Sequence, residues 1–493
     1  MANPMLLTDF YKTIHHMAYK PNMTKLVSYW TPRMSRKEKM DKVVMFGLQP
    51  FIKKYLIEYF NENFFNRDKE EVISEYKRII KFTMGEVASD TKHIEELHDL
   101  GYLPIEINAV AEGTRVNIKT PMIEITNTHD DFAWLVNYLE TFMSCHIWQP
   151  MTSATIAYRY REIINKYYSE TVDNSDKSRA VGDFSMRGMS SLESAELSGS
   201  AFLTSFLGTA TIPAIMFLEK YYKCNIENEL VGLGTPSTEH SVMCSYGRNE
   251  LEAYKRLITE VFPNGTLSIV SDTYDYWNLI TKILPKLKDQ IMARDGKVVI
   301  RGDSGDPVKI ICGDKEATPG TPEYKGTVEL LYDIFGGYAN SKGYKVLDSH
   351  IGTVYGDSIT VERCEEICNQ LKEKGFAANN VTLGMGSFST QYTTRDTFGF
   401  ALKATYAIID GKETFIYKEP KTDTGNFKKS QKGLCYVYNI GEDILYKDEL
   451  NETDKMNLNL SHKNLLEPVF KNGKILKEFS LKEIRGRLHK GEF

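Results

Sequence analysis

The sequence predicts an α/β protein: an irregular α/β barrel with a second, α+β domain built from both ends of the chain. Two observations predict the barrel. Four apolar segments rich in β-branched residues each stop at a cluster of acidic, small and glycine residues, and helix-like stretches separate them. Strands that alternate with helices, with polar residues where each strand ends, are typical of βαβ units and a parallel sheet. The second domain is predicted from period-two alternation near both termini.

The segment 298–307 carries the strongest of these signals. Its valines and isoleucine suit a buried strand, which the following glycines and Pro307 end. Arg301 and Asp303 should therefore lie at the carboxyl end of a strand, where α/β barrels carry their chemistry. An arginine fork suits phosphate, carboxylates suit hydroxyls or a metal ion, and glycines let a ligand approach backbone N–H groups.

The same pattern recurs three times along the barrel region. The strand segments and the residues that follow them are 267–270 with Ser271, Asp272 and Asp275, 350–355 with Gly356 and Asp357, and 381–383 with Gly384, Gly386 and Ser387. A helix is predicted from Thr360 to Lys374, because apolar residues recur on one face and Gly375 follows as a stop. Any one polar cluster has an alternative interpretation as an ordinary loop, but four in succession favour a shared binding site.

Length and composition limit the possible classes of protein. A chain of 493 residues exceeds one simple domain, so we expect two or three units. A net charge of −5 argues against a general nucleic-acid binder. The first residues lack the pattern of a secretory signal, and no apolar run approaches the ~20 residues that span a membrane. Seven cysteines without a Cys-x-x-Cys pair favour a reducing compartment, so we expect a cytoplasmic protein.

The predicted domain boundaries divide the chain into residues 1–147, 148–392 and 393–493. The first and third parts form the α+β domain, and the middle part forms the barrel. The local predictions outside the barrel are an amphipathic helix over 46–65, a small antiparallel sheet over 105–126, a helix over 131–148, a hairpin over 469–476 around Asn472-Gly473, and a final helix with a capping box at Ser480 and Glu483.

Three further segments each have two interpretations. In 183–191, Phe184 could stack on a flat ring while Arg187 holds an anion, or they are a core phenylalanine and a surface arginine. His240 follows Glu239 in a loop of small residues, which suits either an exposed nucleophile whose protonation Glu239 influences or a structural histidine. The lysine-rich stretch 418–433 suits a solvated loop or a polyphosphate clamp.

Together these residues resemble the nicotinamide phosphoribosyltransferase family, which is related to the nicotinate phosphoribosyltransferases. The resemblance runs in order over nearly the whole chain. The motifs that carry it are Thr8–Lys12, Phe46–Gln49, Leu103–Ile107, Asp183-Phe184 with Arg187-Gly188, Ser190-Ser191, Glu239–Ser241, Ser271-Asp272 with Tyr274-Asp275, Arg301 with Asp303–Gly305, Gly356-Asp357, Thr394–Asp396 and Val469–Gly473. The resemblance implies a type II phosphoribosyltransferase fold and an obligate homodimer with two shared sites. It also implies transfer of 5-phosphoribosyl from phosphoribosyl pyrophosphate to nicotinamide.

The resemblance also implies a role for each site residue. The pyridine ring is expected between Phe184 and the partner subunit's Tyr11, with Arg301 alongside. Residues expected to hold the sugar and its phosphates are Asp303, Gly356 and Asp357 at the ribose, Gly386 and Ser387 at its 5-phosphate, and Arg187 at phosphate groups. Arg395 and Asp9 are expected to reach in from the partner subunit, and Asp183, Ser271, Asp272 and Asp275 are expected among the other substrate-binding residues. Mg²⁺ is expected to be bound through the substrate diphosphate, and ATP, as an optional coupling substrate, is expected to phosphorylate His240.

This reaction needs no general base, because the pyridine nitrogen has no proton to lose. The transition state is a sugar with cationic, oxocarbenium-like character. The protein must position a flat ring, neutralise the diphosphate leaving group and exclude water. The absence of an obvious acid–base pair among the motifs agrees with these requirements.

Two positions depart from the family pattern. Ala210 stands where an aspartate is expected to accept a hydrogen bond from the nicotinamide amide, and Gly182 replaces an expected histidine. An aspartate would repel nicotinate, since like charges ~4 Å apart at an effective dielectric near 20 cost about 4 kcal/mol, roughly a thousandfold. The alternatives that remain are a nicotinate phosphoribosyltransferase and, from another class, a ligand-binding dimer without turnover.

Overall fold

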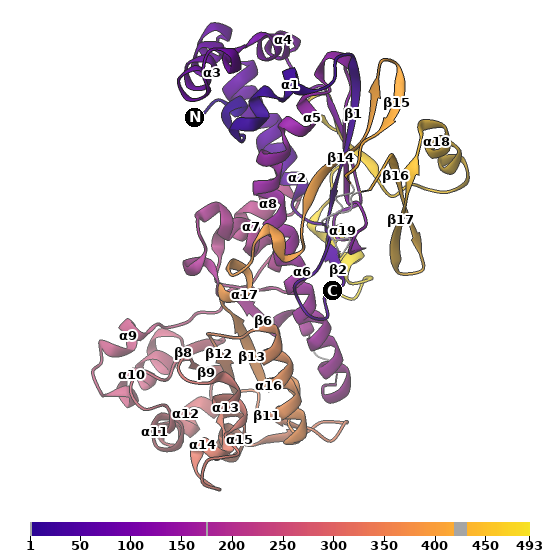
Figure 1. Ribbon diagram of the computed structural model, residues 1–493. Coiled ribbons are helices and arrows are strands. Elements are labelled where there is room, and N and C mark those ends of the chain that lie inside the picture. Colours follow the sequence, from indigo (N-terminus) through magenta and orange to yellow (C-terminus); the bar gives the residue numbers. More distant parts are fainter. Residues whose placement is uncertain (1, 174–175, 419–430) are drawn as a thin grey trace. The chain divides into compact units, whose positions relative to one another are not determined.

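The computed structural model describes residues 2–173, 176–418 and 431–493, which form two units (Figure 1). Unit 1 comprises Met1–Thr155, Phe217–Cys224 and Thr393–Phe493, and unit 2 comprises Ile156–Met216 and Asn225–Tyr392. The first division falls inside the long helix α6 (Glu140–Thr171), which continues through Pro150. Most of the lysine-rich stretch 418–433, with its two interpretations, lies outside the described residues.

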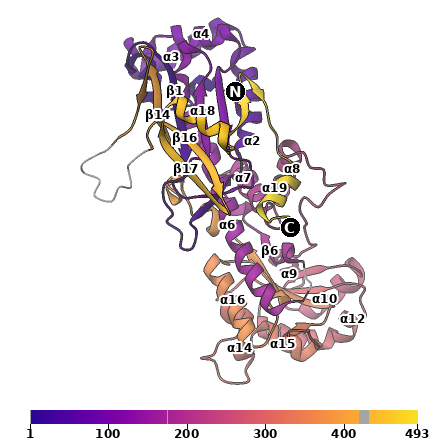
Figure 2. The ribbon, with the colours of Figure 1, turned by 90° about the vertical axis from the view of Figure 1, so that its right-hand side faces the viewer.

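The central sheet of unit 1 joins the two ends of the chain. Its strand order is β15-β14-β1-β5-β3-β18-β19. The strands are β1 (Met23–Thr31), β3 (Ile105–Ala109), β5 (Ile123–Asn127), β14 (Ala401–Ile409), β15 (Lys412–Phe415), β18 (Glu467–Lys471) and β19 (Lys474–Ile475). The indigo β1 runs antiparallel beside the orange β14 in both views (Figures 1 and 2). This pairing confirms the expectation of an α+β domain built from both ends of the chain.

The small antiparallel sheet predicted over 105–126 needs a correction. β3 pairs with β5 as expected, but β4 (Arg115–Asn117) pairs with β2 (Lys42–Val44) in a separate sheet. The chain turns away at Gly113, whose φ is +87°. A Cβ there would lie 2.6 Å from the carbonyl oxygen of Ile484, so only glycine fits this turn.

The predictions for 46–65, for the hairpin and for the last helix are confirmed, whereas the helix predicted over 131–148 is divided between α5 (Leu135–Tyr138) and the start of α6. Residues 46–65 are helical from α2 (Leu48–Phe51) onward, although Ile52–Tyr59 and Asn61–Phe65 are π-helical. Asn472 and Gly473 turn the β18–β19 hairpin with φ of 50° and 75°, and Ser480 and Glu483 form the capping box of α19 (Leu481–Leu488). The remaining elements are α1 (His15–Ala18), α3 (Lys69–Met84), α4 (Lys92–Leu100), α18 (Glu452–Ser461), β16 (Leu434–Ile440) and β17 (Asp443–Leu450). The second division between the units falls inside α8 (Ile212–Tyr221), after Met216.

Unit 2 is built on a parallel sheet in the order β7-β6-β13-β12-β9-β8. The strands are β6 (Val181–Asp183), β7 (Gly208–Thr209), β8 (Leu267–Val270), β9 (Val298–Gly302), β12 (Ile351–Tyr355) and β13 (Val381–Met385). Two further strands, β10 (Gly337–Ala339) and β11 (Lys345–Leu347), pair with each other outside this sheet. The helices of unit 2 are α7 (Leu192–Phe202), α9 (His240–Cys244), α10 (Glu250–Arg256), α11 (Tyr276–Asn278), α12 (Lys288–Met292), α13 (Pro307–Cys312), α14 (Pro322–Lys325), α15 (Thr327–Phe335), α16 (Val361–Glu373) and α17 (Phe388–Gln391).

A non-strand segment bridges the two edges of this sheet. Leu233 makes a parallel bridge to Gly208 of β7, and Ser237 makes one to Ser268 of β8. Gly232, Gly234 and Pro236 are unfavourable in a regular strand, so the segment pairs at both ends without becoming one. We call Leu233–Thr238 the closing segment, and it accounts for the irregularity of the predicted barrel.

The predicted helix over 360–374 is confirmed as α16. The Thr360 side chain caps it by accepting a hydrogen bond from the Arg363 N–H, and Cys364, Ile367, Cys368 and Leu371 form its buried face. Gly375 follows the helix with φ of 77°. Across the ranges that the structure describes, every helix is too short or too polar to cross a membrane.

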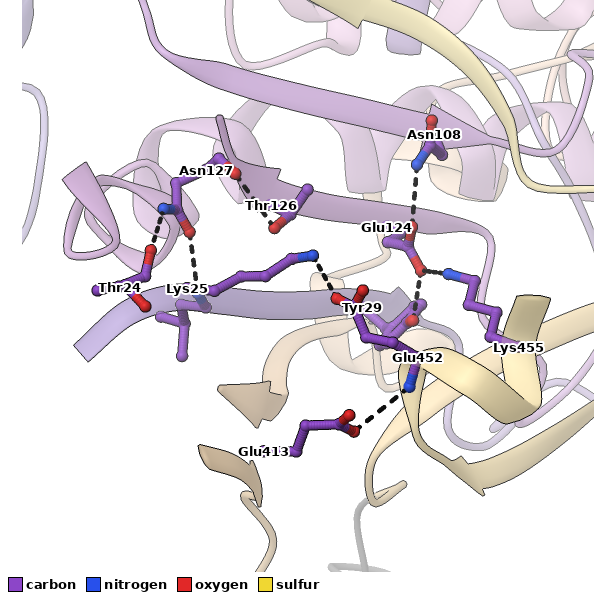
Figure 3. Close-up of polar contacts among 11 residues, drawn as sticks. Thr24, Lys25, Tyr29, Asn108, Glu124, Thr126, Asn127, Glu413, Glu452 and Lys455 are labelled. Atoms are coloured by element: carbon purple, nitrogen blue, oxygen red, sulfur yellow. Dashed lines mark hydrogen bonds and ion pairs between the residues drawn. The ribbon is translucent and has the colours of Figure 1, made fainter. Parts of the chain in front are cut away.

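A buried carboxylate links four elements of unit 1 (Figure 3). Glu124 of β5 accepts hydrogen bonds from Lys455 of α18 at 2.5 Å, from Asn108 of β3 at 2.9 Å and from the Tyr29 hydroxyl of β1. Burial raises the pKa of the Glu124 carboxyl, but the charge of Lys455 and these hydrogen bonds outweigh that effect, so the pKa lies below its ordinary value. The network therefore stabilises the joint between the two ends of the chain.

We predict that Lys455→Met destabilises unit 1 by about 3–5 kcal/mol, because Glu124 would remain buried without its cation. Urea denaturation followed by tryptophan fluorescence measures this, since Trp30, Trp134 and Trp148 all lie in unit 1. Lys463→Met is the control, because Lys463 pairs with Glu467 but its side chain is 75% exposed. We expect the control to cost less than about 1 kcal/mol. Equal losses in both variants would contradict the role of the buried pair.

The same pair has a defined pH dependence. A carboxyl with a lowered folded-state pKa stabilises the fold above its unfolded pKa of about 4.3, and this contribution disappears as the pH falls through the folded value. The difference in stability between the wild type and Lys455→Met should therefore shrink below about pH 4.

Candidate functional site

The carboxyl ends of the parallel strands in unit 2 meet at one edge of the sheet. The strand register aligns Val270 with Arg301, Gly302 with Tyr355, and Met385 with Asp183. The site residues predicted for the barrel therefore follow strand ends at this one edge, except His240, which follows the closing segment. Tyr11, Asp9 and Arg395 belong to unit 1.

Arg301 and Asp303 form a bidentate ion pair at the end of β9. Arg301 Nε donates to Asp303 Oδ1 at 3.0 Å, and Nη2 donates to Oδ2 at 2.7 Å. The guanidinium carbon lies 5.7 Å from the centroid of the Phe184 ring. A Cβ on Gly356 would collide with Asp303 and lie 2.8 Å from Arg301 Nε, so this glycine makes room for the pair. The arrangement presents an aromatic ring and a fixed cation side by side.

Glycines on neighbouring strands set the position of the Phe184 ring. A Cβ on Gly384 would lie 2.6 Å from Phe184 Cδ2, and one on Gly182 would lie 3.4 Å from Cε1. The Phe184 N–H also donates to the carbonyl of Met385 at 2.9 Å. The ring therefore excludes a side chain at Gly384, whereas a Cβ at 182 would make ordinary contact, and nothing in the structure explains glycine in place of the expected histidine.

Three of the residues predicted to bind substrate make hydrogen bonds within the protein. The fully buried Asp183 carboxylate accepts hydrogen bonds from the Ser185 N–H at 3.0 Å, the Ser185 hydroxyl at 2.6 Å and the Thr211 hydroxyl at 2.7 Å. Ser271 is fully buried and bonds the Tyr254 hydroxyl at 2.7 Å. Asp275 caps α11 by accepting from the Asn278 N–H. Their contacts order the strand ends, because these polar atoms already bond to protein groups.

His240 pairs with Asp272, whereas the sequence suggested Glu239 as its partner. His240 Nε2 lies 3.1 Å from Asp272 Oδ1, while Glu239 accepts a hydrogen bond from the Ser241 hydroxyl. Asp272 Oδ2 accepts the Asp303 N–H at 2.9 Å. Burial raises the pKa of the Asp272 carboxyl, but hydrogen bonds from Ser304, the Asp303 N–H and His240 bring it below its ordinary value. Asp272 therefore stays charged and orients an imidazole whose side chain is 47% exposed.

Sequence reasoning missed this partnership because adjacency in the chain suggested the wrong acid. His240 begins α9 directly after the closing segment, and the Thr238 N–H donates to Ser268 of β8. That pairing places His240 beside Asp272, which follows β8. The Ser271-Asp272 sequence after an apolar strand predicted a carboxylate at the strand end, but it carried no information about which residue that carboxylate contacts.

The candidates for binding the ribose and the phosphates in this part of the site include Asp357 and Arg187, on loops of the same edge. Asp357 and Arg187 are exposed, and the Asp357 carboxylate accepts from Ser358 at 2.8 Å. A Cβ on Gly386 would lie 3.6 Å from Asp357, and one on Gly188 would collide with Ser387. These contacts bring the loops after β6, β12 and β13 together. Ala210, after β7, is exposed and donates its N–H to the Asp183 carbonyl at 2.8 Å.

The three candidates in unit 1 lie at its surface. Tyr11 is 55% exposed, and the Arg395 side chain is 47% exposed and lies 3.5 Å from Asp396. Asp9 accepts a hydrogen bond from the Thr141 hydroxyl at 2.7 Å. Their surface positions leave the aromatic ring and the guanidinium available to another molecule.

Comparisons with known proteins agree with these features. The family model described as "Nicotinate phosphoribosyltransferase (NAPRTase) family" matches residues 180–474, and that of the "Nicotinamide phosphoribosyltransferase, N-terminal domain" matches 3–107. A nicotinamide phosphoribosyltransferase of Acinetobacter baylyi is 45% identical, covering 99% of this chain and 97% of that protein, and one of Xanthomonas campestris is 32% identical, covering 98% of each.

Solved structures show the same fold at low identity. A nicotinate-nucleotide pyrophosphorylase from Pyrococcus furiosus superimposes with a TM-score of 0.59 at 16% identity, covering 99% of this chain and 96% of that one. Human nicotinic acid phosphoribosyltransferase gives 0.54 at 13%, covering 99% and 93%. The fold is thus that of the type II phosphoribosyltransferases, as expected from the sequence. With the family model matching most of the chain, the protein belongs to the nicotinate phosphoribosyltransferase family.

Proposed function

We propose that this enzyme transfers 5-phosphoribosyl from phosphoribosyl pyrophosphate to nicotinamide, giving nicotinamide mononucleotide and diphosphate for NAD biosynthesis. The observation that carries the proposal is the bidentate Arg301–Asp303 pair held beside the Phe184 ring. Relatives named nicotinamide phosphoribosyltransferase, at 45% and 32% identity over nearly the full length, support the same choice of base. The seven cysteines, none of which forms a disulfide in the described structure, fit a reducing, cytoplasmic setting.

In this proposal, Phe184 and Arg301 bind the pyridine. The ring stacks on Phe184, and the guanidinium hydrogen-bonds the amide carbonyl while Asp303 fixes its orientation. The partner subunit's Tyr11 covers the other face of the pyridine, and the partner's Asp9 and Arg395 complete the site of a homodimer. The exposure of Tyr11 in the single chain supports this arrangement.

The sugar and its phosphates bind across the loops that follow β12 and β13. The carboxylates of Asp303 and Asp357 accept hydrogen bonds from the ribose hydroxyls, close to Gly356. Backbone N–H groups near Gly386 and Ser387 donate hydrogen bonds to the 5-phosphate. Arg187 neutralises phosphate charge. The negative carboxylates beside the anomeric carbon also stabilise the cationic sugar that forms as diphosphate departs.

Magnesium fits this edge as a companion of the substrate. Within the described parts of the chain, the carboxylates at the strand ends form no ready cage of three ligands. Mg²⁺ is commonly held by one or two carboxylates and substrate phosphates, so Asp357 is the residue that would contact it. When bound, the ion would neutralise the diphosphate leaving group.

We also propose that ATP phosphorylates His240, which couples hydrolysis to product formation. Asp272 holds the exposed imidazole in one orientation, as the third member of a catalytic triad does. This role for ATP is optional, because the transfer itself uses only the strand-end residues.

The experiment that tests the function is a two-substrate assay. Purified protein is given phosphoribosyl pyrophosphate, Mg²⁺ and either nicotinamide or nicotinate, and both mononucleotides are quantified. We expect nicotinamide mononucleotide as the better product. A preference for nicotinate would assign the alternative activity, for which Ala210 in place of an aspartate is the specific reason. No product from either base would favour a ligand-binding dimer.

We predict that Arg301→Ala lowers kcat/KM for nicotinamide by about 10²–10³, because a fixed charge beside the ring is lost. Asp303→Ala should act in the same direction. Arg256→Ala is the control, since Arg256 pairs with Glu260 on the surface of unit 2. Size-exclusion chromatography should find all three variants in the wild-type oligomeric state. Full activity in Arg301→Ala would remove the proposed site.

We predict that Gly384→Ala raises KM for nicotinamide at least tenfold, because the added Cβ would displace the Phe184 ring. KM for phosphoribosyl pyrophosphate should change less. Gly234→Ala is the control: its Cβ would meet only the Thr209 carbonyl oxygen, at 3.8 Å. Equal effects of the two alanines on nicotinamide would contradict ring stacking on Phe184.

We predict that His240→Ala retains basal transfer and loses stimulation by ATP. His350→Ala is the matched control, because His350 also pairs with an aspartate, Asp348, at 2.6 Å in unit 2. Initial rates with and without ATP make the comparison. Undiminished stimulation in His240→Ala would exclude the phosphohistidine.

A further inference from the structure

Two histidines and an aspartate of unit 1 gather at a place with no part in the proposed reaction. His16 belongs to α1, His93 to α4, and Asp90 lies just before α4. Each offers one ligand atom, and these atoms lie within 4.8 Å of one another. The two imidazoles stack with centroids 3.5 Å apart, and Trp134 packs edge-on against His93 at 4.8 Å.

A backbone contact determines which nitrogen of His16 is available. His16 Nδ1 lies 3.0 Å from the Thr13 carbonyl oxygen, which can only accept, so Nδ1 carries the hydrogen. In the neutral ring, Nε2 then bears a lone pair, and it lies 3.6 Å from Asp90 Oδ2. Burial lowers the pKa of His16, although the Thr13 carbonyl and Asp90 oppose that effect. A lone pair facing a carboxylate oxygen is repulsive unless a cation lies between them.

Both ring nitrogens of His93 are buried without a polar contact in the described structure. The residue is only 6% exposed, and among the described residues neither ring nitrogen has a hydrogen-bond partner. A buried imidazole with no anionic partner favours its neutral form. A buried polar group without a partner is unfavourable, and a bound cation would supply the missing interaction.

We propose that His16, His93 and Asp90 bind one divalent transition-metal ion, with Zn²⁺ the best match. Neutral imidazoles and a carboxylate are ligands that zinc favours, whereas Mg²⁺ and Ca²⁺ favour oxygen alone. Ligand atoms ~2.1 Å from a tetrahedral zinc lie about 3.4 Å apart, close to the observed separation of His16 and Asp90.

The surroundings match those of a metal site. The Thr13 carbonyl orients His16 in the way that outer groups usually orient a metal-binding histidine, and Trp134 and Tyr76 provide an aromatic wall at His93. The planes of the two rings are only 16° apart, so binding one ion requires the imidazoles to rotate out of the stack until their in-plane lone pairs converge. Three protein ligands leave a fourth position for water, on the side of the half-exposed Asp90.

The experiment measures metal binding directly on the full chain. Protein treated with EDTA and then dialysed is titrated with Zn²⁺ by calorimetry, and Co²⁺ is substituted to record its visible absorption. We expect one ion per chain with a tetrahedral cobalt spectrum. Asp90→Asn should weaken binding at least tenfold, and His93→Leu should abolish it. Zn²⁺ should also raise the melting temperature of the wild type more than that of either variant.

A matched control comes from the same unit. His129 Nδ1 and Asp131 Oδ2 lie 3.7 Å apart, but both side chains are exposed, so His129→Ala should bind Zn²⁺ as the wild type does. The exposed Asp90 gives a variant that should fold even if His93→Leu does not. The proposal is overturned if the wild type binds no zinc, or if binding is undiminished in both Asp90→Asn and His16→Gln.

Discussion

The parallel register of the strands in unit 2 is the constraint on which the rest of the site depends. Because all pairs are parallel, residues from sequence positions as distant as Asp183, Arg301 and Asp357 end at the same edge. The closing segment completes this arrangement between β7 and β8 without being a strand itself. Gly234 and Pro236 in this segment cause the irregularity that a symmetric barrel would not have, and the segment leads the chain to His240 at the same edge.

Close backbone approach at glycines is the second consequence of that register. Gly356 lies against the Arg301–Asp303 pair, and Gly384 lies against the Phe184 ring. In each case a Cβ would occupy the space of a side chain that the sequence predicts for the site. The glycines at the strand ends therefore serve packing around the ring and the ion pair as much as ligand access, which the sequence pattern alone had suggested.

The acidic residues at the strand ends differ in burial and in their contacts. The buried Asp183 accepts hydrogen bonds from a backbone N–H and from side-chain hydroxyls, whereas the exposed Asp275 accepts one from the Asn278 N–H. The partly buried Asp272 connects the exposed His240 to the backbone of Asp303. In unit 1, Glu124 has a comparable structural task at the joint between the chain ends, whereas among the described residues neither ring nitrogen of His93 has a hydrogen-bond partner.

The amino-acid sequence by itself determined the features that arise from local physics. Alternation of apolar strands with an amphipathic helix predicted the βαβ units, Asn472-Gly473 predicted a turn, and Thr360 and Ser480 predicted helix caps, since each depends on neighbours within a few residues. The tertiary structure alone decided which acid meets His240, where β4 pairs, how the barrel closes and that His16 meets His93. Such contacts join residues far apart in the chain, and periodicity carries no information about them because it records only the face on which a residue lies.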